Sequence, residues 1–562
     1  MSRPGGQGCI GETEAAAPIV SYVNTTTIDT AVVISIDDLR TASNQIDTEL
    51  TQTFADVFAQ HRTWRKAAAY TDAITACDTP VKTCWDLAEK AGHHTPGPFQ
   101  SLIAENRWDH HEIWNRIATA VPRLVPCPAD DPLGPGIAVD ETAQPKRGHH
   151  TVGTGTQWAG CLGHTTNCVT SVFLSYITPQ AATWIAHGLF LPKKDWFTGA
   201  GATGKARRAA AGVPDDVAFQ TKPQIARREF QKLRELGVHF TWAVGDEVYG
   251  RYAALRDDHE KNGEAYAYFV PKNFLIPTGA GGWHSAQELG QRAQGRFEVR
   301  SAGPGRYGPR WYEWAMIEAG APHHYLLVRQ PWSPPEATTT RTGTNSSHDD
   351  SSHDTSYVYC FVPPESPISP TLPNLVLMAG RRWPMEETIA AGKGPLGWDH
   401  HQYRTWTSLC HHTALCGLAM LKATALRAYV ENTTAFPSPP TAFSSTPTEN
   451  TIQTPPTEDI PGPQTRLSPP SPDRSPESRD EVMIPLGDSL VPVFPDQPCP
   501  PNIGYIRLTL NETLRLIGIA HAGLSKARMA FHLRWSRWRR RHQAIARWHH
   551  FRAKLAAQAA PT

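Results

Sequence analysis

Three acidic residues stand at the ends of predicted secondary-structure elements, where their side chains could bind hard cations. Asp140 ends the apolar run GIAV, Asp246 ends FTWAVG, and Glu386 opens a helical segment. We expect both aspartates at strand ends of one sheet, where ligands collect in α/β layers. Converging carboxylates would form an all-oxygen site for two Mg²⁺ ions, or Mn²⁺, suited to in-line attack on a phosphodiester. An isolated strand-terminal aspartate is more commonly a turn or capping residue, so spacing alone leaves both alternatives open.

An acidic residue follows each of these three in the chain, at Glu141, Glu247 and Glu387. Adjacent residues of a strand or helix point in different directions, so only one member of each pair can face a common site. We choose the first member of each pair as catalytic residue and metal ligand.

The elements that must position these acids follow an α/β pattern. Short runs rich in β-branched and aromatic residues predict strands, and apolar residues three and four apart predict helices. The predicted order is strands at 136–142, 167–180 and 183–192, a helix at 222–237, a strand at 238–250, a helix at 251–263 and a strand at 264–273. This βββαβαβ order predicts one α/β layer.

Composition divides the chain further. The predicted parts are a disordered arm (1–32), an all-α N-terminal domain (33–130), the first part of the α/β core (131–272), a β-rich insertion with a polar tip (273–375), the second part of the core (376–431), a disordered Pro/Ser/Thr linker (432–480) and a basic helical segment (481–562). In the N-terminal domain, two short helices joined by a tight turn resemble a DNA-binding helix-turn-helix, and a plain helical scaffold is the alternative. The linker contains twelve prolines, a composition that does not form a packed core.

Positive charge is concentrated near the C-terminus. The chain has 54 Lys and Arg against 53 Asp and Glu, yet residues 526–554 hold ten basic residues and no acid. Three tryptophans there, Trp535, Trp538 and Trp548, alternate with Arg534, Arg537, Arg539, Arg540 and Arg541. This pattern favours binding to a nucleic-acid backbone. The alternatives are a helix that packs its tryptophans on the body and an amphipathic helix on an anionic membrane.

Several other classes of protein fit poorly. An uncharged apolar run of about 18 residues is absent, as is an apolar signal core at the N-terminus, so we expect a cytoplasmic protein without membrane contact. The ten cysteines include no C-x-x-C pair, which argues against a disulfide framework or zinc ribbon. Gly204 and Lys205 complete a G-x-x-x-x-G-K spacing, but Ala206 lacks the hydroxyl that a P-loop needs for magnesium.

A series of longer motifs resembles bacterial insertion-sequence transposases of the DDE superfamily, specifically the insertion sequence 701 family. The motifs are TCWDLAEKAG with FQSLIAENRWD, then AVDET, GVPDDVAFQTKP, VGDEVYG, GPRWYEWA, RRWPMEETIAAGKGPLGWDHHQYRTW and LRWSRWRRRHQA. They occur in the family's order, and the likeness covers most of residues 50–430.

The resemblance implies an RNase H-like catalytic domain in which Asp140, Asp246 and Glu386 bind two Mg²⁺ ions per active site. Related transposases have a Y-x2-R-x3-E-x6-K signature, and Arg382, Glu386 and Lys393 have its spacing. The resemblance implies that both basic residues contact phosphate, Arg382 through its forked guanidinium and Lys393 as a point charge. Ala379 stands where that signature has tyrosine. The alternative for Arg382 and Lys393 is a salt-bridged surface helix.

The resemblance also implies a function. We expect a DNA transposase, associated with the nucleoid, that binds the inverted-repeat ends of its element as a homodimer on double-stranded DNA and then cleaves and joins strands. Two alternatives stay open, a catalytically silent DNA-binding descendant of a transposase and an RNase H-like nuclease without strand transfer.

Overall fold

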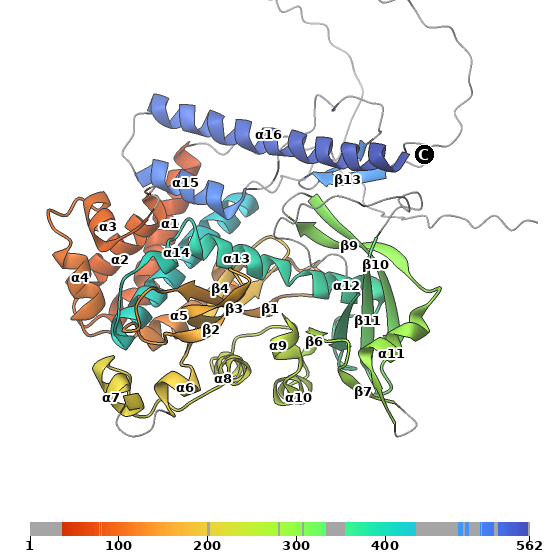
Figure 1. Cartoon of the computed structure of the whole chain (residues 1–562). Coiled ribbons are helices and arrows are strands. Elements are labelled where there is room, and N and C mark those ends of the chain that lie inside the picture. Colours follow the sequence, from red (N-terminus) through yellow and green to blue (C-terminus); the bar gives the residue numbers. More distant parts are fainter. Residues whose placement is uncertain are drawn as a thin grey trace, which may run out of the picture.

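The computed structural model in Figure 1 describes residues 36–77, 79, 81–198, 203–278, 282–305, 308–332, 355–433, 482–486, 489–493, 499, 506, 508–521 and 526–559. The predicted arm 1–32, most of the polar tip of the predicted insertion and nearly all of the predicted linker 432–480 lie outside these residues.

A mixed sheet of ten strands forms the centre of the described structure. Its strands are β1 (Gly136–Pro145), β2 (Gly155–Ala159), β3 (His164–Ile177), β4 (Ala182–Phe190), β5 (Trp242–Gly245), β6 (Ala265–Val270), β9 (Glu298–Gly305), β10 (Gly308–Glu318), β11 (His324–Pro331) and β12 (Ser356–Phe361). They lie in the order β2-β3-β1-β5-β6-β12-β11-β10-β9, and β4 pairs with β3. The β1–β5 and β5–β6 pairs are parallel, and the others are antiparallel.

Helices cover both faces of the sheet around the parallel strands (Figure 1). On one side lie α8 (Lys222–Glu235), α9 (Glu247–Gly250) and α10 (Ala253–Lys261); on the other lie α12 (Leu372–Gly380), α13 (Trp383–Lys393) and α14 (Trp406–Thr433). Burial on both faces explains why β5 is an uninterrupted apolar run, WAVG, in which every residue is buried.

The N-terminal helices share the main hydrophobic core with α14. They are α1 (Ile36–Phe54), α2 (His61–Ala76), α3 (Cys84–Lys90), α4 (Gly97–Ala104) and α5 (His110–Leu124). Lys422 of α14 is buried and pairs with Asp47 of α1 and Asp72 of α2, each at 2.5 Å. A buried ammonium needs such partners. The helices predicted for the N-terminal domain are present. They pack on α14, whose residues belong to the predicted second part of the core.

The predicted insertion does not form a separate sheet. Its strand β12 pairs with β6 from Tyr357↔Val270 to Phe361↔Tyr266, and β11, β10 and β9 follow. The exposed edge of β6 thus receives a strand that is distant in sequence, and the core sheet continues into the insertion. Only β7 (Leu275–Pro277) and β8 (Trp283–Ser285), among the described strands of this region, pair apart from it.

Other elements also differ from the prediction. The predicted strand 238–250 shortens to β5 because Asp246 starts a helix, and β2 and α12 had not been predicted. The predicted helical segment 481–562 begins with a hairpin, β13 (Val482–Leu486) and β14 (Ser489–Val493), whose β-branched and apolar residues favour strands. It then forms α15 (Leu510–His521) and α16 (Lys526–Ala559). The remaining short helices are η1 (Ala55–Val57), α6 (Lys193–Trp196), α7 (Thr203–Ala210), α11 (Ala286–Gly290), η2 (Gln291–Ala293) and η4 (Trp398–His400). Across the described ranges, every helix is too short or too polar to cross a bilayer.

Candidate active site

Asp140 and Asp246 lie side by side at the same edge of the sheet. In the parallel pair β1–β5 the last register partners are Val139 and Gly245, and the two aspartates follow them directly. Gly245 permits this approach, because a Cβ there would come within 2.8 Å of the Val139 side chain and 2.9 Å of Tyr268. The two aspartates are therefore level with each other, but only Asp246 follows a strand end. The prediction that Asp140 ends its strand is wrong, because β1 continues to Pro145 through its antiparallel pairing with β3.

Asp246 also has a local structural role. It is the N-cap of α9, and its Oδ1 accepts a hydrogen bond from the backbone N–H of Val248 at 2.9 Å. The capping alternative raised by the sequence is thus present in the structure, and it fixes the direction of this side chain.

The side chain of Arg382 lies between Asp140 and Glu386 and contacts both. Its guanidinium donates to Oδ2 of Asp140 at 3.0 Å and to Oε1 of Glu386. The side chains of Asp140, Arg382 and Glu386 are 16%, 25% and 36% exposed, so these charges are only partly solvated. Asp140 and Arg382, which are 242 positions apart in the chain, thereby come into contact.

Contacts along α13 hold Glu386 over the sheet. Thr388 shares a buried hydrogen bond of 3.1 Å with Ser175 of β3, and Gly392 lies so close to the Trp184 ring that a Cβ would meet it at 2.1 Å. Lys393 donates to the carbonyl oxygen of Ala143 in β1 at 2.6 Å. This ammonium, predicted to contact phosphate, is therefore bound to the backbone of β1 here.

Burial and mutual repulsion disfavour ionisation of the paired aspartates. Burial raises the pKa of Asp140 to about 7, with a further increase from the charges of Asp246 and Glu141 that Arg382 opposes. Burial and the charge of Glu141 raise the pKa of Asp246 to about 6, again opposed by Arg382. Such groups gain most from an added cation.

The acidic neighbours have partners of their own. Glu141 accepts hydrogen bonds from Lys222 at 2.8 Å and from the Tyr249 hydroxyl at 2.7 Å. Glu247 is exposed and lies 3.6 Å from Arg251, and Glu387 accepts from the indole N–H of Trp383 at 3.2 Å. The network of Glu141, Lys222 and Tyr249 was not predicted, although Tyr249 lies in the motif VGDEVYG.

The carboxylates fit a hard divalent cation in chemistry but not in their present spacing. Asp140, Asp246 and Glu386 offer oxygen donors alone, the set that Mg²⁺ prefers. Over the described part of the chain, however, no three His, Cys, Asp or Glu side chains converge closely enough to hold a metal ion. Arg382 supplies the positive charge between Asp140 and Glu386, so metal binding at all three acids requires this guanidinium to move.

The C-terminal arginines divide into two groups. Arg539 donates twice to Glu512 of α15, at 3.0 and 2.5 Å, and Arg540 donates to the carbonyl oxygen of Ile506 at 2.6 Å. These two arginines, predicted to bind DNA, help fold the tail onto itself because their donors reach acceptors within it. Arg534 and Arg541 are exposed, and Arg537 is half-buried.

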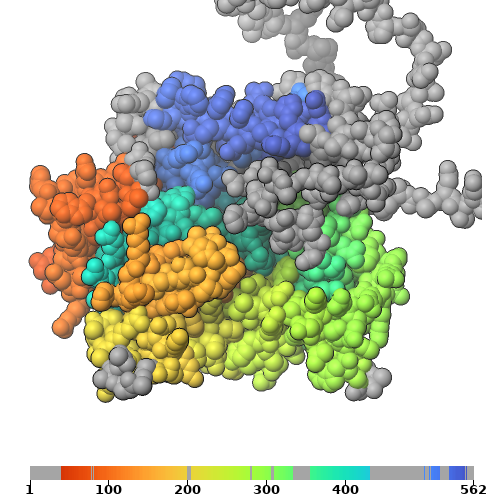
Figure 2. Space-filling view, viewed as in Figure 1, coloured from red at the N-terminus to blue at the C-terminus, as the bar shows by residue number. Residues whose placement is uncertain are grey.

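The tryptophans of α16 also differ in their exposure to solvent. Trp548 is buried, as the packing alternative expected, whereas Trp535 and Trp538 are 44% and 54% exposed. The helix lies at the surface of the molecule in Figure 2. It presents a face of exposed aromatic and basic side chains and packs with the opposite one.

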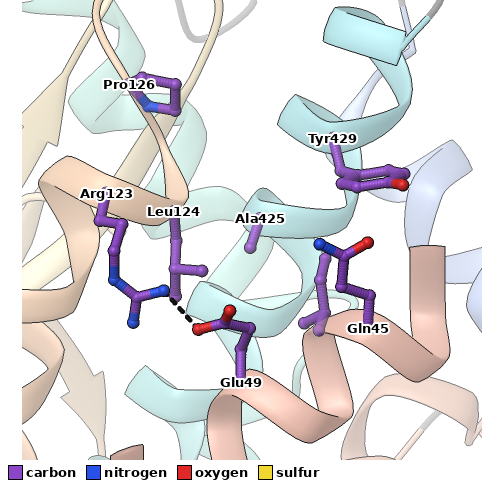
Figure 3. A pocket seen from close by; sticks show the side chains of 8 residues that line it. Gln45, Glu49, Arg123, Leu124, Pro126, Ala425 and Tyr429 are labelled. Atoms are coloured by element: carbon purple, nitrogen blue, oxygen red, sulfur yellow. Dashed lines mark hydrogen bonds and ion pairs between the residues drawn. The ribbon is translucent and has the colours of Figure 1, made fainter.

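A cavity of about 350 Å³ lies between α1, α5 and α14, away from these acids (Figure 3). Gln45, Glu49, Arg123 and Tyr429 line it, and Arg123 pairs with Glu49 inside it. It contains none of the predicted catalytic residues.

Comparison with known proteins identifies the region that carries the two aspartates. Residues 53–281 match the DDE superfamily endonuclease family, a span that includes Asp140 and Asp246 and ends before Glu386. No curated protein matches the sequence. Members of this family hydrolyse phosphodiesters of DNA and typically use divalent metals. Residues 53–281 are therefore a DDE superfamily endonuclease domain.

Proposed function

We propose that this protein is a DNA transposase of the insertion-sequence kind, which cleaves DNA at the ends of its element and joins the freed strand to a target. The observation that carries the proposal is the meeting of Asp140, Arg382 and Glu386 beside Asp246, at the level where β5 ends and its parallel pairing with β1 stops. The strand order β4-β3-β1-β5-β6 supports an RNase H-like core.

The chain's own groups suit this reaction in three ways. Asp140 and Asp246, fixed by β1 and by the cap of α9, supply carboxylates that become stable anions when a cation reaches them. Divalent ions bound by Asp140, Asp246 and Glu386 would activate the attacking oxygen and stabilise the leaving oxygen. Arg382, when released from the carboxylates, has the planar fork needed to hold a phosphate.

Lys393 has a supporting role in this proposal. Its contact with Ala143 ties α13, which carries Glu386, to β1, which carries Asp140. Binding of a phosphate by the same ammonium would exchange a neutral acceptor for a charged one. The exposed basic face of α16 supplies further contacts to the DNA backbone, and two ends held together imply a homodimer on DNA.

A cleavage and joining assay tests the proposal. The substrate is a supercoiled plasmid that carries the DNA flanking the coding sequence, with Mg²⁺ or Mn²⁺. We expect nicked and joined products from the native protein, and at least about a hundredfold less of both from Asp246→Asn, with DNA binding retained. Glu247→Gln, an exposed acid one position away, is the matched control and retains activity.

The alternatives give different results. DNA binding without metal-dependent cleavage in any form supports a silent descendant of a transposase. Cleavage without joined products supports a nuclease. Equal loss of activity in Asp246→Asn and Glu247→Gln, with both proteins folded, contradicts the assigned acids.

A further inference from the structure

Two arginines of the antiparallel half of the sheet lie at the same edge as the catalytic acids. The register continues from Gly245 to Tyr268 of β6, so the next residue, Phe269, is level with Asp246. Phe269 pairs with Val358 of β12, which pairs with Leu327 of β11. Arg329 lies two residues beyond Leu327, toward the edge where Asp246 leaves β5.

Side chains two residues apart on a strand share a face, so Arg329 is on the face that carries Leu327 and Phe269. The ring contacts agree with this placement. The guanidinium of Arg329 lies 5.5 Å from the Phe269 ring centroid, and that of Arg382 lies 5.8 Å from it. Arg329 and Arg382 therefore border one aromatic ring.

Arg310 of β10 extends this arrangement. Its guanidinium donates to the carbonyl oxygen of Gly380 at 2.8 Å and lies 5.1 Å from the ring of Trp383, both at the junction of α12 and α13. Three guanidinium groups thus run from the acid cluster across the strands β6, β12, β11 and β10.

The charges of Arg310 and Arg329 are compensated only from a distance, by the carboxylate of Glu386. Within the ranges that the structure describes, neither has a carboxylate within ion-pair distance, whereas Arg300 on the neighbouring strand β9 pairs with Glu298 at 2.5 Å. Arg310 donates to backbone carbonyls, and Arg329 donates to the hydroxyl of Ser356 at 2.9 Å. Burial lowers the pKa of both groups, as expected for partly desolvated cations without a close counter-ion.

We propose that Arg310 and Arg329, together with Arg382 once it leaves the acids, form an anion-binding strip that holds consecutive phosphates of a DNA strand beside the acid cluster. The proposal rests on the proposed function and extends it, since it gives the path of the strand across the β12–β10 side of the sheet. A DNA backbone is the occupant that the strip favours, because forked donors along an edge match a row of phosphates.

Equilibrium binding without metal tests the strip separately from catalysis. The full chain is titrated onto a fluorescein-labelled duplex of the flanking DNA in EDTA at several salt concentrations. Arg329→Gln is the main variant, because its single described hydrogen bond, to Ser356, is easily replaced. We expect about tenfold weaker binding and a decrease of about one in the slope of log K against log salt.

Three further variants complete the design. Arg300→Gln is the matched control, with affinity and slope unchanged, since Glu298 already neutralises Arg300. Arg329→Lys keeps the slope of the native protein but recovers only part of the affinity, because it keeps the charge and loses the fork. Arg310→Gln is expected to act like Arg329→Gln and is used only if its unfolding midpoint matches that of the native protein.

The outcomes separate the two proposals. Native-like affinity and slope in Arg329→Gln overturn the strip, even when metal-dependent cleavage is present. A lower slope in Arg329→Gln supports the strip, even when no cleavage is found and the proposed transposase activity fails. Equal losses in Arg329→Gln and Arg300→Gln also overturn it, because they indicate a general effect of charge.

Discussion

The acid edge, which is the side of the sheet where Asp140, Asp246 and Glu386 lie, and the helix α16 are both rich in arginine. The arginines of the two regions have different surroundings. Beside the sheet, Arg381 and Arg382 are consecutive residues that reach two different acids. Arg382 reaches Asp140 at the acid edge, and Arg381 reaches Asp131, which precedes the start of β1. On α16 the arginines follow one another along an exposed helix, and Arg534 lies open to solvent. The buried charges beside the sheet depend on specific partners, whereas an exposed charge on the helix, such as that of Arg534, acts mainly through salt-dependent attraction.

The largest expected effect comes from Arg381→Met. Arg381 and Asp131 form two hydrogen bonds, at 2.7 and 2.5 Å, and their side chains are 10% and 3% exposed. Removing the guanidinium leaves a buried carboxylate without a partner, so we expect a loss of about 3–5 kcal/mol in the free energy of unfolding. Urea denaturation measures it. A loss below about 1 kcal/mol would remove the distinction between the two regions.

The second prediction concerns pH in the absence of metal. The folded-state pKa values of Asp140 and Asp246, about 7 and about 6, lie above the ordinary value of 3.8. The folded protein therefore binds more protons than the unfolded chain between these values, and stability falls as pH rises through 6 and 7. In EDTA we expect a loss of roughly 4 kcal/mol between pH 5 and pH 8, the larger part of it from Asp140.

Two variants sharpen this pH test. Asp140→Asn removes one of the two raised groups and should flatten the decline, whereas the exposed Glu247→Gln should follow the native curve. Added Mg²⁺ should restore stability most strongly at pH 8. A native protein equally stable at pH 5 and pH 8 in EDTA would contradict the burial of these charges.

A smaller effect is expected at Arg539, which joins α16 to α15. The side chains of Arg539 and Glu512 are 28% and 7% exposed, between the cases of a buried and a surface pair. We expect Arg539→Met to cost about 1 kcal/mol and to increase amide hydrogen exchange in α15 and α16. Unchanged exchange would show that this pair does not hold the tail together.

The smallest effect on stability is expected at Arg534. Arg534→Gln should change the free energy of unfolding by less than about 0.5 kcal/mol. In DNA binding it should reduce the salt slope by about one, as for one lost phosphate contact. If the slope stays that of the native protein, Arg534 does not contact DNA.

The sequence predicted the acid edge because its signals are local. A buried apolar run followed by aspartate identifies a strand, and Gly136–Asp140 and Trp242–Asp246 both have this form. The aspartate marks the end of the strand only for β5, since β1 continues to Pro145. The parallel register of β1 and β5 then brings the two aspartates together. The choice of Glu386 needed the family resemblance. Its own segment indicates the i,i+4 pair with Arg382, but not the contact between Arg382 and Asp140.

The remaining features depend on pairings between distant segments. Arg310 and Arg329 lie near the catalytic acids only because β12 pairs with β6. Hydrophobic patterns do not specify which two strands pair. The arginine-rich pattern of α16 likewise did not predict the pairing of Arg539 with Glu512, because a count of charges does not tell whether α16 packs against α15. Composition thus predicted the type of the C-terminal elements better than their contacts.

The pairing of β11 with β12 has a consequence for engineering and for comparing sequences. Arg329 and Ser356 are register partners, so the peptide between them starts and finishes at two points about 5 Å apart. A fluorescent protein or epitope whose ends are equally close could be spliced in there without separating Asp246 from Glu386. The number of residues between those two acids is thus a poor guide to relatedness, since natural chains can vary it at this point at little cost.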